Sequence, residues 1–240
     1  MFGYAKSILS VALIVVGLVL GLGDAKAAES LSAAKVLDQL TPENTALLLV
    51  DYQPQYAFAT QSISIDALIN NATALTKVAK VFKLPTVITT ITADSYGGPM
   101  FPQIRAVMPD AEVIDRTPIN AWQDEKVRKA IHATGRKKLL IAGLWTDNCV
   151  MLPALYALKE GYEVYVVTDA SGDSDAVSHE RAVQRLVQAG AVPITWLPVL
   201  LELETDWTKD KTNGEVYNIL RDHAGAMGIG AFYKQFLSTK

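Results

Sequence analysis

Two patterns of hydrophobic and polar residues alternate along most of the chain. Short, continuous apolar runs, which are typical of buried strands, cover residues 46–51, 85–92, 138–143, 163–169 and 192–196. Longer stretches with apolar residues at helical spacing cover residues 64–82, 124–135, 150–161 and 176–190, and the last three end at a glycine. Apolar strands that alternate with helices form parallel sheets covered on both faces. The pattern therefore predicts an α/β fold, a doubly wound parallel sheet with helices on both faces.

The first 27 residues follow a different pattern. Lys6 precedes the apolar run "ILSVALIVVGLVLGLG", and "AKA" at residues 25–27 has the form of a small-x-small cleavage site. The run is shorter than the roughly 20 apolar residues of a membrane-spanning helix. We expect residues 1–27 to be a signal peptide, with an uncleaved anchor as the alternative, and residues 28–240 to be a single domain with a C-terminal helical tail. The mature protein is then secreted or periplasmic, without stable membrane association.

Composition and charge exclude several kinds of partner. The net charge is -3, and the charges are well mixed, so no basic face for nucleic acid is expected. A single cysteine excludes an internal disulfide and a cysteine-based zinc site. The three histidines lie far apart, and no glycine-rich nucleotide motif is present. We therefore expect no metal and no cofactor, and a small molecule as the substrate.

Polar residues at the ends of the predicted strands are the candidates for a functional site, because ligands bind beyond the carboxyl ends of strands in such sheets. Asp51 ends the first strand, and Gln53 follows two residues later. An aspartate at this position is either the N-cap of the following segment or a catalytic base. Cys149 lies at the start of the helix that follows strand 138–143. One interpretation of this cysteine is a nucleophile, and the alternative is a small buried apolar side chain. A thiol at a helix N-terminus is predicted to have a lowered pKa. Pro153 indicates that this helix start is distorted.

Two further groups have weaker signals. Asp169, Ser171 and Asp173 follow the strand 163–169, where loop capping is the simpler interpretation. Arg116 and the stretch "INAW", residues 119–122, precede the helix 124–135. A cation beside a thiolate would stabilise it, whereas a solvated arginine and a tryptophan in the core are the alternatives.

Several stretches in this order resemble the isochorismatase-like cysteine hydrolases. They are "LLLVDYQ", "IAGLWTDNCV" and "GYEVYVVTDASGD", and the resemblance extends from about Ala46 to Trp207. The fragments "INAW", "VTDASGD" and "ETDWTKD" are most similar to the YcaC-like branch of that family. The resemblance implies an isochorismatase-like three-layer sandwich and a homo-oligomer, with the tail after Leu197 as a candidate contact.

The resemblance also implies roles for individual residues. Asp51 corresponds to the general base, and Cys149 to the nucleophile that forms an acyl thioester. Arg116 takes the place of the lysine that most of the family has as its third catalytic residue. The backbone N–H groups of Trp145 and Cys149 correspond to the oxyanion hole, with a non-proline cis peptide between Leu144 and Trp145.

Two hypotheses about function remain open. The first is hydrolysis of a small amide-type C–N bond by Cys149 through the thioester. The second is a non-hydrolytic ligand-binding or thiol-reactive protein on the same fold, because an arginine stays protonated and cannot shuttle protons. Candidate substrate-binding residues are Gln53, Tyr56, Asn120 and Trp122, and Phe58 is a further aromatic candidate.

Overall fold

The computed structural model describes residues 38–208 and 211–238. The predicted signal peptide lies outside the described residues, and the division of the chain at residue 27 stays a prediction. From Leu40 onward the chain forms one compact unit. Among the described helices, none is long and apolar enough to cross a membrane.

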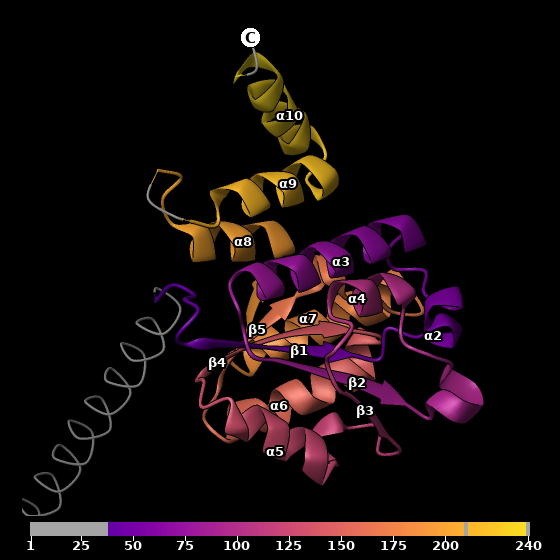
Figure 1. Cartoon of the computed structure of the whole chain (residues 1–240). Helices are drawn as coiled ribbons and strands as arrows, with labels where there is room; N and C mark the ends of the chain where they lie inside the picture. Colours follow the sequence, from indigo (N-terminus) through magenta and orange to yellow (C-terminus); the bar gives the residue numbers. More distant parts are fainter. Residues whose placement is uncertain (1–37, 209–210, 239–240) are drawn as a thin grey trace, which may run out of the picture. The chain divides into compact units, whose positions relative to one another are not determined.

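Six strands in the described part of the chain form one parallel sheet with the order β3-β2-β1-β4-β5-β6 (Figure 1). The strands are β1 (Thr45–Val50), β2 (Thr86–Ile91), β3 (Val113–Arg116), β4 (Lys138–Gly143), β5 (Glu163–Val167) and β6 (Val192–Ile194). The chain builds outward from β1 to β3, then returns to β4 on the other side of β1 and continues to β6. This reversal between β1 and β4 is the switch point of a doubly wound sheet, and it confirms the predicted fold.

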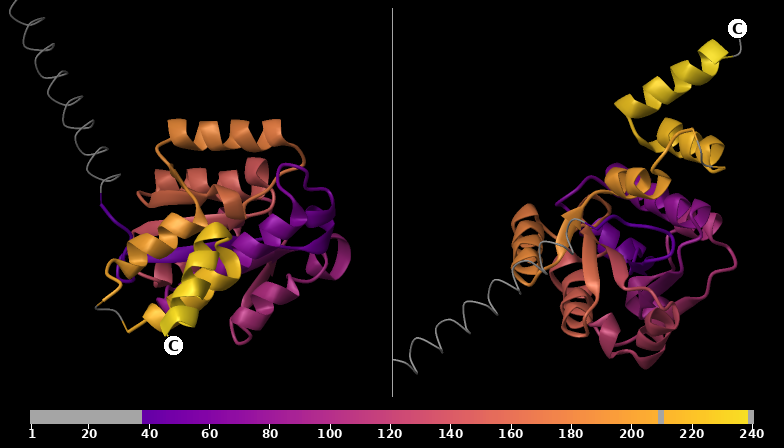
Figure 2. Two further views of the ribbon diagram at one scale, coloured as in Figure 1. Left: turned by 90° about the horizontal axis from the view of Figure 1, so that it is seen from above. Right: turned by 90° about the vertical axis from the view of Figure 1, so that its left-hand side faces the viewer.

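Helices cover both faces of the sheet, as Figures 1 and 2 show. The first face packs against α3 (Ile65–Val81), α4 (Pro102–Val107) and α8 (Trp196–Glu204), and α9 (Asn213–His223) lies outside them on α3 and α8. The second face packs against α5 (Glu125–Ala133), α6 (Met151–Lys159) and α7 (Ala176–Gln188). A short helix, α2 (Pro54–Phe58), follows β1, and α10 (Ala226–Ser238) ends the described chain. The tail is helical, as predicted.

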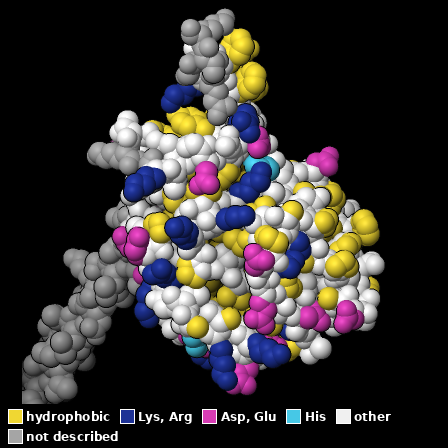
Figure 3. Space-filling view, viewed as in Figure 1, with side chains coloured by type: hydrophobic (Ala, Val, Ile, Leu, Met, Phe, Trp, Pro, Cys, Tyr) yellow, Lys and Arg dark blue, Asp and Glu magenta, His cyan; other side chains and the backbone are white. Residues whose placement is uncertain are grey.

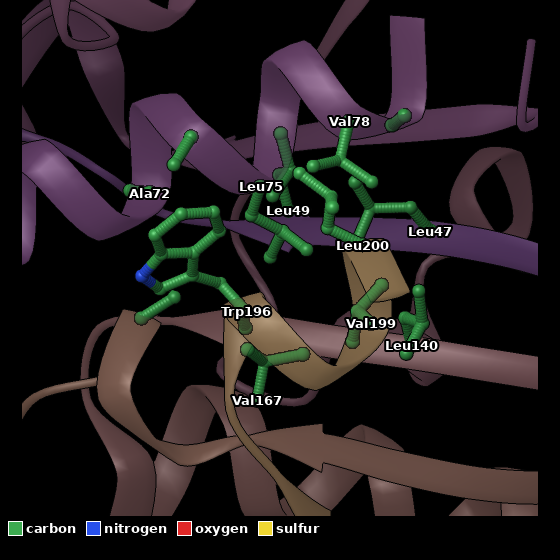
Figure 4. Close-up of a cluster of buried hydrophobic side chains, with 14 of the residues drawn as sticks. Leu47, Leu49, Ala72, Leu75, Val78, Leu140, Val167, Trp196, Val199 and Leu200 are labelled. Atoms are coloured by element: carbon green, nitrogen blue, oxygen red, sulfur yellow. The ribbon is translucent and has the colours of Figure 1, made fainter. Parts of the chain in front are cut away.

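The core on the first face explains why the apolar run of β1 has no polar interruption. Leu47 and Leu49 of β1 point toward α3, while Leu48 and Val50 belong to the cluster on the other face. Figure 4 shows side chains of β1, α3 and α8 in contact, including Trp196 at the start of α8. Burial of each such large apolar side chain stabilises the fold by roughly 1.5–3 kcal/mol. A strand buried on both faces is thereby fixed at the centre of the sheet.

One glycine allows β1 and β4 to end side by side. Gly143 pairs with Val50 in the parallel register, and its φ of 155° lies in a region that L side chains rarely adopt. A Cβ atom at this position would lie 2.0 Å from the Val50 carbonyl oxygen. Only glycine permits this approach, and it brings Asp51 next to the segment that leads to Cys149.

Candidate active site

Asp51 is fixed at the carboxyl end of β1. It is buried, and its φ of 53° is left-handed, which is uncommon outside glycine. Its backbone N–H donates to the Thr89 carbonyl of β2 at 3.0 Å, and the Thr89 hydroxyl donates to its carboxylate at 3.0 Å. The carboxylate is therefore held by the neighbouring strand and does not cap a helix.

Arg116 is the last residue of β3, and its guanidinium is buried against Asp51. Nη2 donates to the Asp51 carboxylate and Nη1 donates to the Pro118 carbonyl. Neither side chain of the ion pair has exposed surface. Within the described residues, Arg116 Nε has no hydrogen-bond partner. The sequence placed this arginine in a loop, because strand β3 was not predicted.

Cys149 lies in a π-helical turn, Thr146–Val150, that precedes α6. The thiol is only 6% exposed and lies within hydrogen-bonding reach of the Asp51 and Arg116 side chains. Pro153 falls in the first turn of α6, so the prediction of a distorted helix start is confirmed. The structure thus brings together all three residues that were predicted to be catalytic.

The thiol pKa differs from the sequence-based prediction. Burial raises the pKa of Cys149 to about 12, and the negative charge of Asp51 adds to this effect, while Arg116 lowers it. The expected low pKa is therefore wrong, because the helix terminus is outweighed by burial and by a carboxylate. Burial also raises the pKa of Asp51 to about 6, although Arg116 offsets part of the shift. At neutral pH a carboxylate consequently lies beside a protonated thiol.

The segment before Cys149 offers backbone donors, as the resemblance implied. The Leu144–Trp145 peptide bond is cis, and the Trp145 N–H has no hydrogen-bond partner in the described part of the chain. The Cys149 N–H, by contrast, donates to the side-chain Oδ1 of Asn148 at 2.5 Å. Asn148 Nδ2 in turn donates to Asp147 Oδ1 at 2.8 Å, which fixes the orientation of the amide. Sequence reasoning treated Asn148 only as a cap and missed this contact.

Aromatic side chains lie next to this segment. Tyr56 of α2 makes an edge-on contact with Trp145, at 5.5 Å between ring centroids, and another with Tyr96 at 5.8 Å. The Trp145 indole N–H is held by the Tyr56 carbonyl and the Thr60 hydroxyl, each at 3.1 Å. Burial raises the pKa of Tyr56, as do Asp51 and Cys149, so its hydroxyl is in electrostatic range of the thiol. Tyr96 was not predicted, while Phe58 is 80% exposed.

Gln53, another of the predicted substrate-binding residues, makes structural contacts with the segment after β2. It is buried, and its Nε2 donates to the carbonyls of Ile91 and Gly98 at 3.1 and 2.7 Å. Its Oε1 accepts the Ile91 N–H at 2.9 Å. A Cβ atom on Gly97 would lie 2.2 Å from this amide. Both amide protons are used by the backbone, so Gln53 fixes the segment 92–98, which carries Tyr96.

Trp122 and Asn120, two of the predicted substrate-binding residues, make contacts within the fold. Trp122 is buried, and its indole N–H donates to Glu160 Oε1 at 2.8 Å. Its ring contacts His132 and Tyr162 edge-on. The Asn120 side chain accepts the Trp122 backbone N–H at 3.0 Å. These contacts support the core alternative for Trp122 and a capping role for Asn120.

The loop after β5 behaves as the simpler interpretation predicted. Asp169 Oδ1 accepts the Trp196 N–H at 3.0 Å, and the Ser171 hydroxyl accepts the Gly143 N–H at 3.2 Å. Asp173 is buried and accepts the Asp147 N–H at 2.8 Å. Among the described residues, no group of three or more His, Cys, Asp or Glu side chains could hold a metal ion. Asp173 thus holds the turn that carries Cys149, whereas Asp169 holds the start of α8.

The fold and the site together define a class of protein. A cysteine lies beside an aspartate and an arginine at the switch point of a parallel α/β sheet, where ligands bind in folds of this kind. A family profile for the isochorismatase domain matches residues 45–197, more than half of the chain. The chain therefore belongs to the isochorismatase family and is a YcaC-like hydrolase.

Known proteins of high similarity agree with this assignment. "Probable hydrolase YcaC" of Escherichia coli is 44% identical over 173 residues, which are 72% of this chain and 83% of that protein. The crystal structure of E. coli YcaC, described as an octameric hydrolase of unknown specificity, has a TM-score of 0.79 at 39% identity and covers 83% of this chain and 97% of its own. YcaC from Pseudomonas aeruginosa, solved with hexane-2,5-diol and covalent acrylamide, has a TM-score of 0.78 at 39% identity, covering 83% and 98%.

Proposed function

We propose that the protein hydrolyses a small amide-type C–N bond through an acyl thioester on Cys149. The observation that carries this proposal is the contact of the buried thiol with Asp51 and Arg116. The Asp51 carboxylate, with a pKa of about 6, is ionised at neutral pH, whereas the Cys149 thiol, with a pKa of about 12, is protonated. The carboxylate can therefore act as the general base that takes the thiol proton. The thiol is thus activated at the moment of attack and not in the resting enzyme.

The reaction runs in two halves. Asp51 takes the thiol proton as Sγ of Cys149 bonds to the carbonyl carbon, and the resulting oxyanion accepts hydrogen bonds from the backbone N–H groups of Trp145 and Cys149. Asp51 then returns the proton to the leaving nitrogen as the C–N bond breaks, which releases the amine and leaves the acyl thioester. Asp51 next takes a proton from water, whose oxygen attacks the thioester. The acid departs and the thiol regains its proton.

Arg116 supplies charge without moving a proton. A guanidinium stays protonated. Its positive charge therefore offsets the negative charge on Asp51 or Cys149 in both halves of the reaction, acylation and hydrolysis of the thioester. In the described part of the chain its Nε–H has no hydrogen-bond partner and is a further buried donor. Arg116 therefore takes the electrostatic role of the lysine that most family members have. Asp51 is then the residue that accepts and returns protons.

A second candidate function is a thiol-reactive or ligand-binding protein that does not turn over. The observation that favours it is the covalent acrylamide in the P. aeruginosa relative, because acrylamide adds to thiols by conjugate addition and is not released. The two functions use the same thiol but form different adducts: acylation gives a thioester that water cleaves, whereas conjugate addition gives a thioether that persists.

The test follows the mass of the intact protein, and an adduct that is absent from Cys149→Ala is assigned to the only thiol of the chain. The protein is mixed with p-nitrophenyl acetate and, separately, with a panel of small primary amides, and Cys149→Ala is the matched control. Hydrolysis predicts a transient acetyl adduct that decays with repeated p-nitrophenol release, and ammonia release from at least one amide. A stable adduct without turnover would favour the second function, and no adduct would contradict both.

We also propose that the protein is a homo-oligomer. The octameric state of the E. coli relative supports this proposal. The high coverage between the two chains, 83% of this one and 97% of the other, means that the relative has few elements that this chain lacks.

A further inference from the structure

The turn that carries Cys149 binds an amide of its own. The Cys149 N–H donates to Oδ1 of the Asn148 side chain at 2.5 Å, and Nδ2 of the same side chain donates to Oδ1 of Asp147 at 2.8 Å. The oxygen of an amide only accepts hydrogen bonds and its NH2 group only donates them, so both contacts require the same orientation. One primary amide thus joins the Cys149 N–H to the Asp147 carboxylate.

The neighbouring N–H groups of this turn donate to acceptors that are fixed in the fold. The Thr146 N–H donates to the Gly172 carbonyl at 2.9 Å. The Asp147 N–H donates to the carboxylate of Asp173 at 2.8 Å, and Asp173 is buried. The acceptor of the Cys149 N–H, by contrast, is a side-chain amide that can leave by rotation about its own bonds. Of these three donors, the Cys149 N–H is therefore the one that a bound molecule can take over.

The Asp147 carboxylate is stabilised by the NH2 group of the amide. Burial raises the pKa of Asp147, and the carboxylates of Asp173 and Asp175 add to the rise. A hydrogen bond from an NH2 group stabilises the ionised form that these surroundings disfavour. When the Asn148 amide leaves, the carboxylate loses this donor unless the arriving molecule carries an NH2 group of its own.

We propose that Asp147 determines the specificity for primary amides, because it accepts a hydrogen bond from the substrate NH2 group in the place that the Asn148 amide now holds. This inference rests on the proposed hydrolysis of a C–N bond. A primary amide has the same two groups as the side chain that it displaces. Its oxygen takes the Cys149 N–H and its nitrogen donates to the carboxylate, whereas an ester or a dialkyl amide makes only the first contact.

The number of hydrogen bonds explains the expected preference. A primary amide replaces both contacts of the Asn148 amide, so the exchange loses two hydrogen bonds and forms two. An ester replaces only the contact with the Cys149 N–H and leaves the Asp147 carboxylate with one donor fewer. A hydrogen bond to a charged group changes binding by roughly 10- to 100-fold. Asp147 takes no proton in this role, so Asp51 remains the general base.

The surface over α2, at the carboxyl end of the sheet, is apolar. Phe58 on this helix is 80% exposed, and Figure 3 shows hydrophobic side chains gathered over α2, on the right-hand side of the view. Tyr56 of the same helix contacts the Trp145 ring edge-on. Apolar groups do not replace the hydrogen bonds that an amide loses when it leaves water. Recognition of an amide here therefore depends on the donors and acceptors of the turn.

The first arm of the test measures how strongly two amides compete with the acylation of Cys149 by p-nitrophenyl acetate. The probes are acetamide, which has an NH2 group, and N,N-dimethylacetamide, which has no N–H. The wild type should bind acetamide more tightly, and Asp147→Ala should lose roughly tenfold or more of this preference. The ester should acylate Asp147→Ala faster than the wild type, because the Asn148 amide is no longer held in place.

Two further variants separate the hydrogen bond from the charge. Asp147→Asn should retain part of the preference, since its amide oxygen is a neutral acceptor. Asp175→Asn is the matched control, because it removes a negative charge that acts on Asp147. Asp175 is the N-cap of α7, and asparagine caps a helix as well as aspartate does. This control should keep the wild-type preference.

The second arm gives a gain that a purely structural role would not produce. Asn148→Ala removes the competing amide and keeps Asp147, so acetamide should bind about fivefold more tightly. A preference that survives in Asp147→Ala, or weaker binding of acetamide to Asn148→Ala, would overturn the role of Asp147. A wild type that is acylated at Cys149 but shows no preference would overturn this inference alone. A wild type that the ester does not acylate would overturn the proposed hydrolysis and this inference with it.

Discussion

At the scale of single residues, the site depends on Cys149 being both buried and next to a carboxylate. These two features raise the thiol pKa to about 12, so the nucleophile is stored as a thiol. This storage also has a chemical benefit, because oxidation of cysteine proceeds through the thiolate. Cys149 is therefore protected by the same carboxylate that activates it.

Replacement of Asp51 by Asn should move two properties of Cys149 in opposite directions. The thiol pKa should fall, because a negative charge that raises it is removed while Arg116 remains. Hydrolysis should nevertheless slow by about 10²–10⁴-fold, because no general base remains. The measurements are alkylation rate against pH and turnover of p-nitrophenyl acetate. An unchanged or higher thiol pKa would mean that the carboxylate does not face the thiol.

The pH dependence of kcat/KM should show one acidic limb. Asp51 has a pKa of about 6, and only its ionised form takes the thiol proton. The rate should therefore fall tenfold per pH unit below about pH 6 and stay level from pH 7 to 9, because the thiol itself titrates near 12. A rate that climbs between pH 8 and 9 would instead identify a free thiolate as the reactant.

Asn148 should restrain the first half of the reaction. Its amide oxygen holds the Cys149 N–H, so a substrate oxygen must displace it before this donor can stabilise an oxyanion. Asn148→Ala should then acylate about fivefold faster, since one hydrogen bond contributes about 1 kcal/mol. Alkylation by iodoacetamide, which forms no oxyanion, is the internal control and should not change. Slower acylation of the variant would mean that the Asn148 contact supports the donor.

At the scale of elements, the edge strand β3 is joined to the centre of the sheet by a buried ion pair. Arg116→Ala leaves the buried Asp51 carboxylate without its opposite charge, which should destabilise the fold by about 3–5 kcal/mol. The pKa values of Asp51 and Cys149 should both rise, because Arg116 lowers them. Arg116→Lys should lose less, since the charge remains while the two-pronged geometry is lost. Chemical denaturation and thiol titration measure both effects, and an Arg116→Ala protein of wild-type stability would exclude the buried pair.

The same strand shows what the sequence could and could not predict. The strands β1, β4 and β5 are long apolar runs buried on both faces, and such runs are recognisable without a structure. β3 has four residues, and its Asp115 and Arg116 interrupt the apolar pattern, so nothing distinguishes it from a loop. Arg116 is buried because it ends this strand, and the thiol pKa of Cys149 depends on the side chains packed around it. Neither property can be read from the residues next to Arg116 or Cys149 in the sequence.

At the scale of the whole molecule, the segment before the domain has a predicted fate. We propose that it is a signal peptide cleaved after Ala27, because Lys6, the apolar run and "AKA" follow in the order that signal peptidase substrates have. Analysis of the N-terminus of protein from the exported fraction should find Ala28 as the first residue. Ala27→Leu, with a large residue at the cleavage position, should retain the segment. Recovery of the wild-type chain with Met1 from membranes would support the anchor instead.

The segment 92–98, which Gln53 holds in place, has a consequence for the evolution of this protein. Asp51, Arg116 and Cys149 belong to the ends of strands and the turn that follows β4, whereas Tyr56 and Tyr96 belong to the connections after β1 and β2, Tyr56 in the short helix α2. Connections tolerate substitution far better than buried strands do. Under the proposed function, mutations in these connections can therefore change which acyl groups reach the thiol while the proton transfer is preserved. Substrate specificity should then diverge among related chains before the reaction itself does.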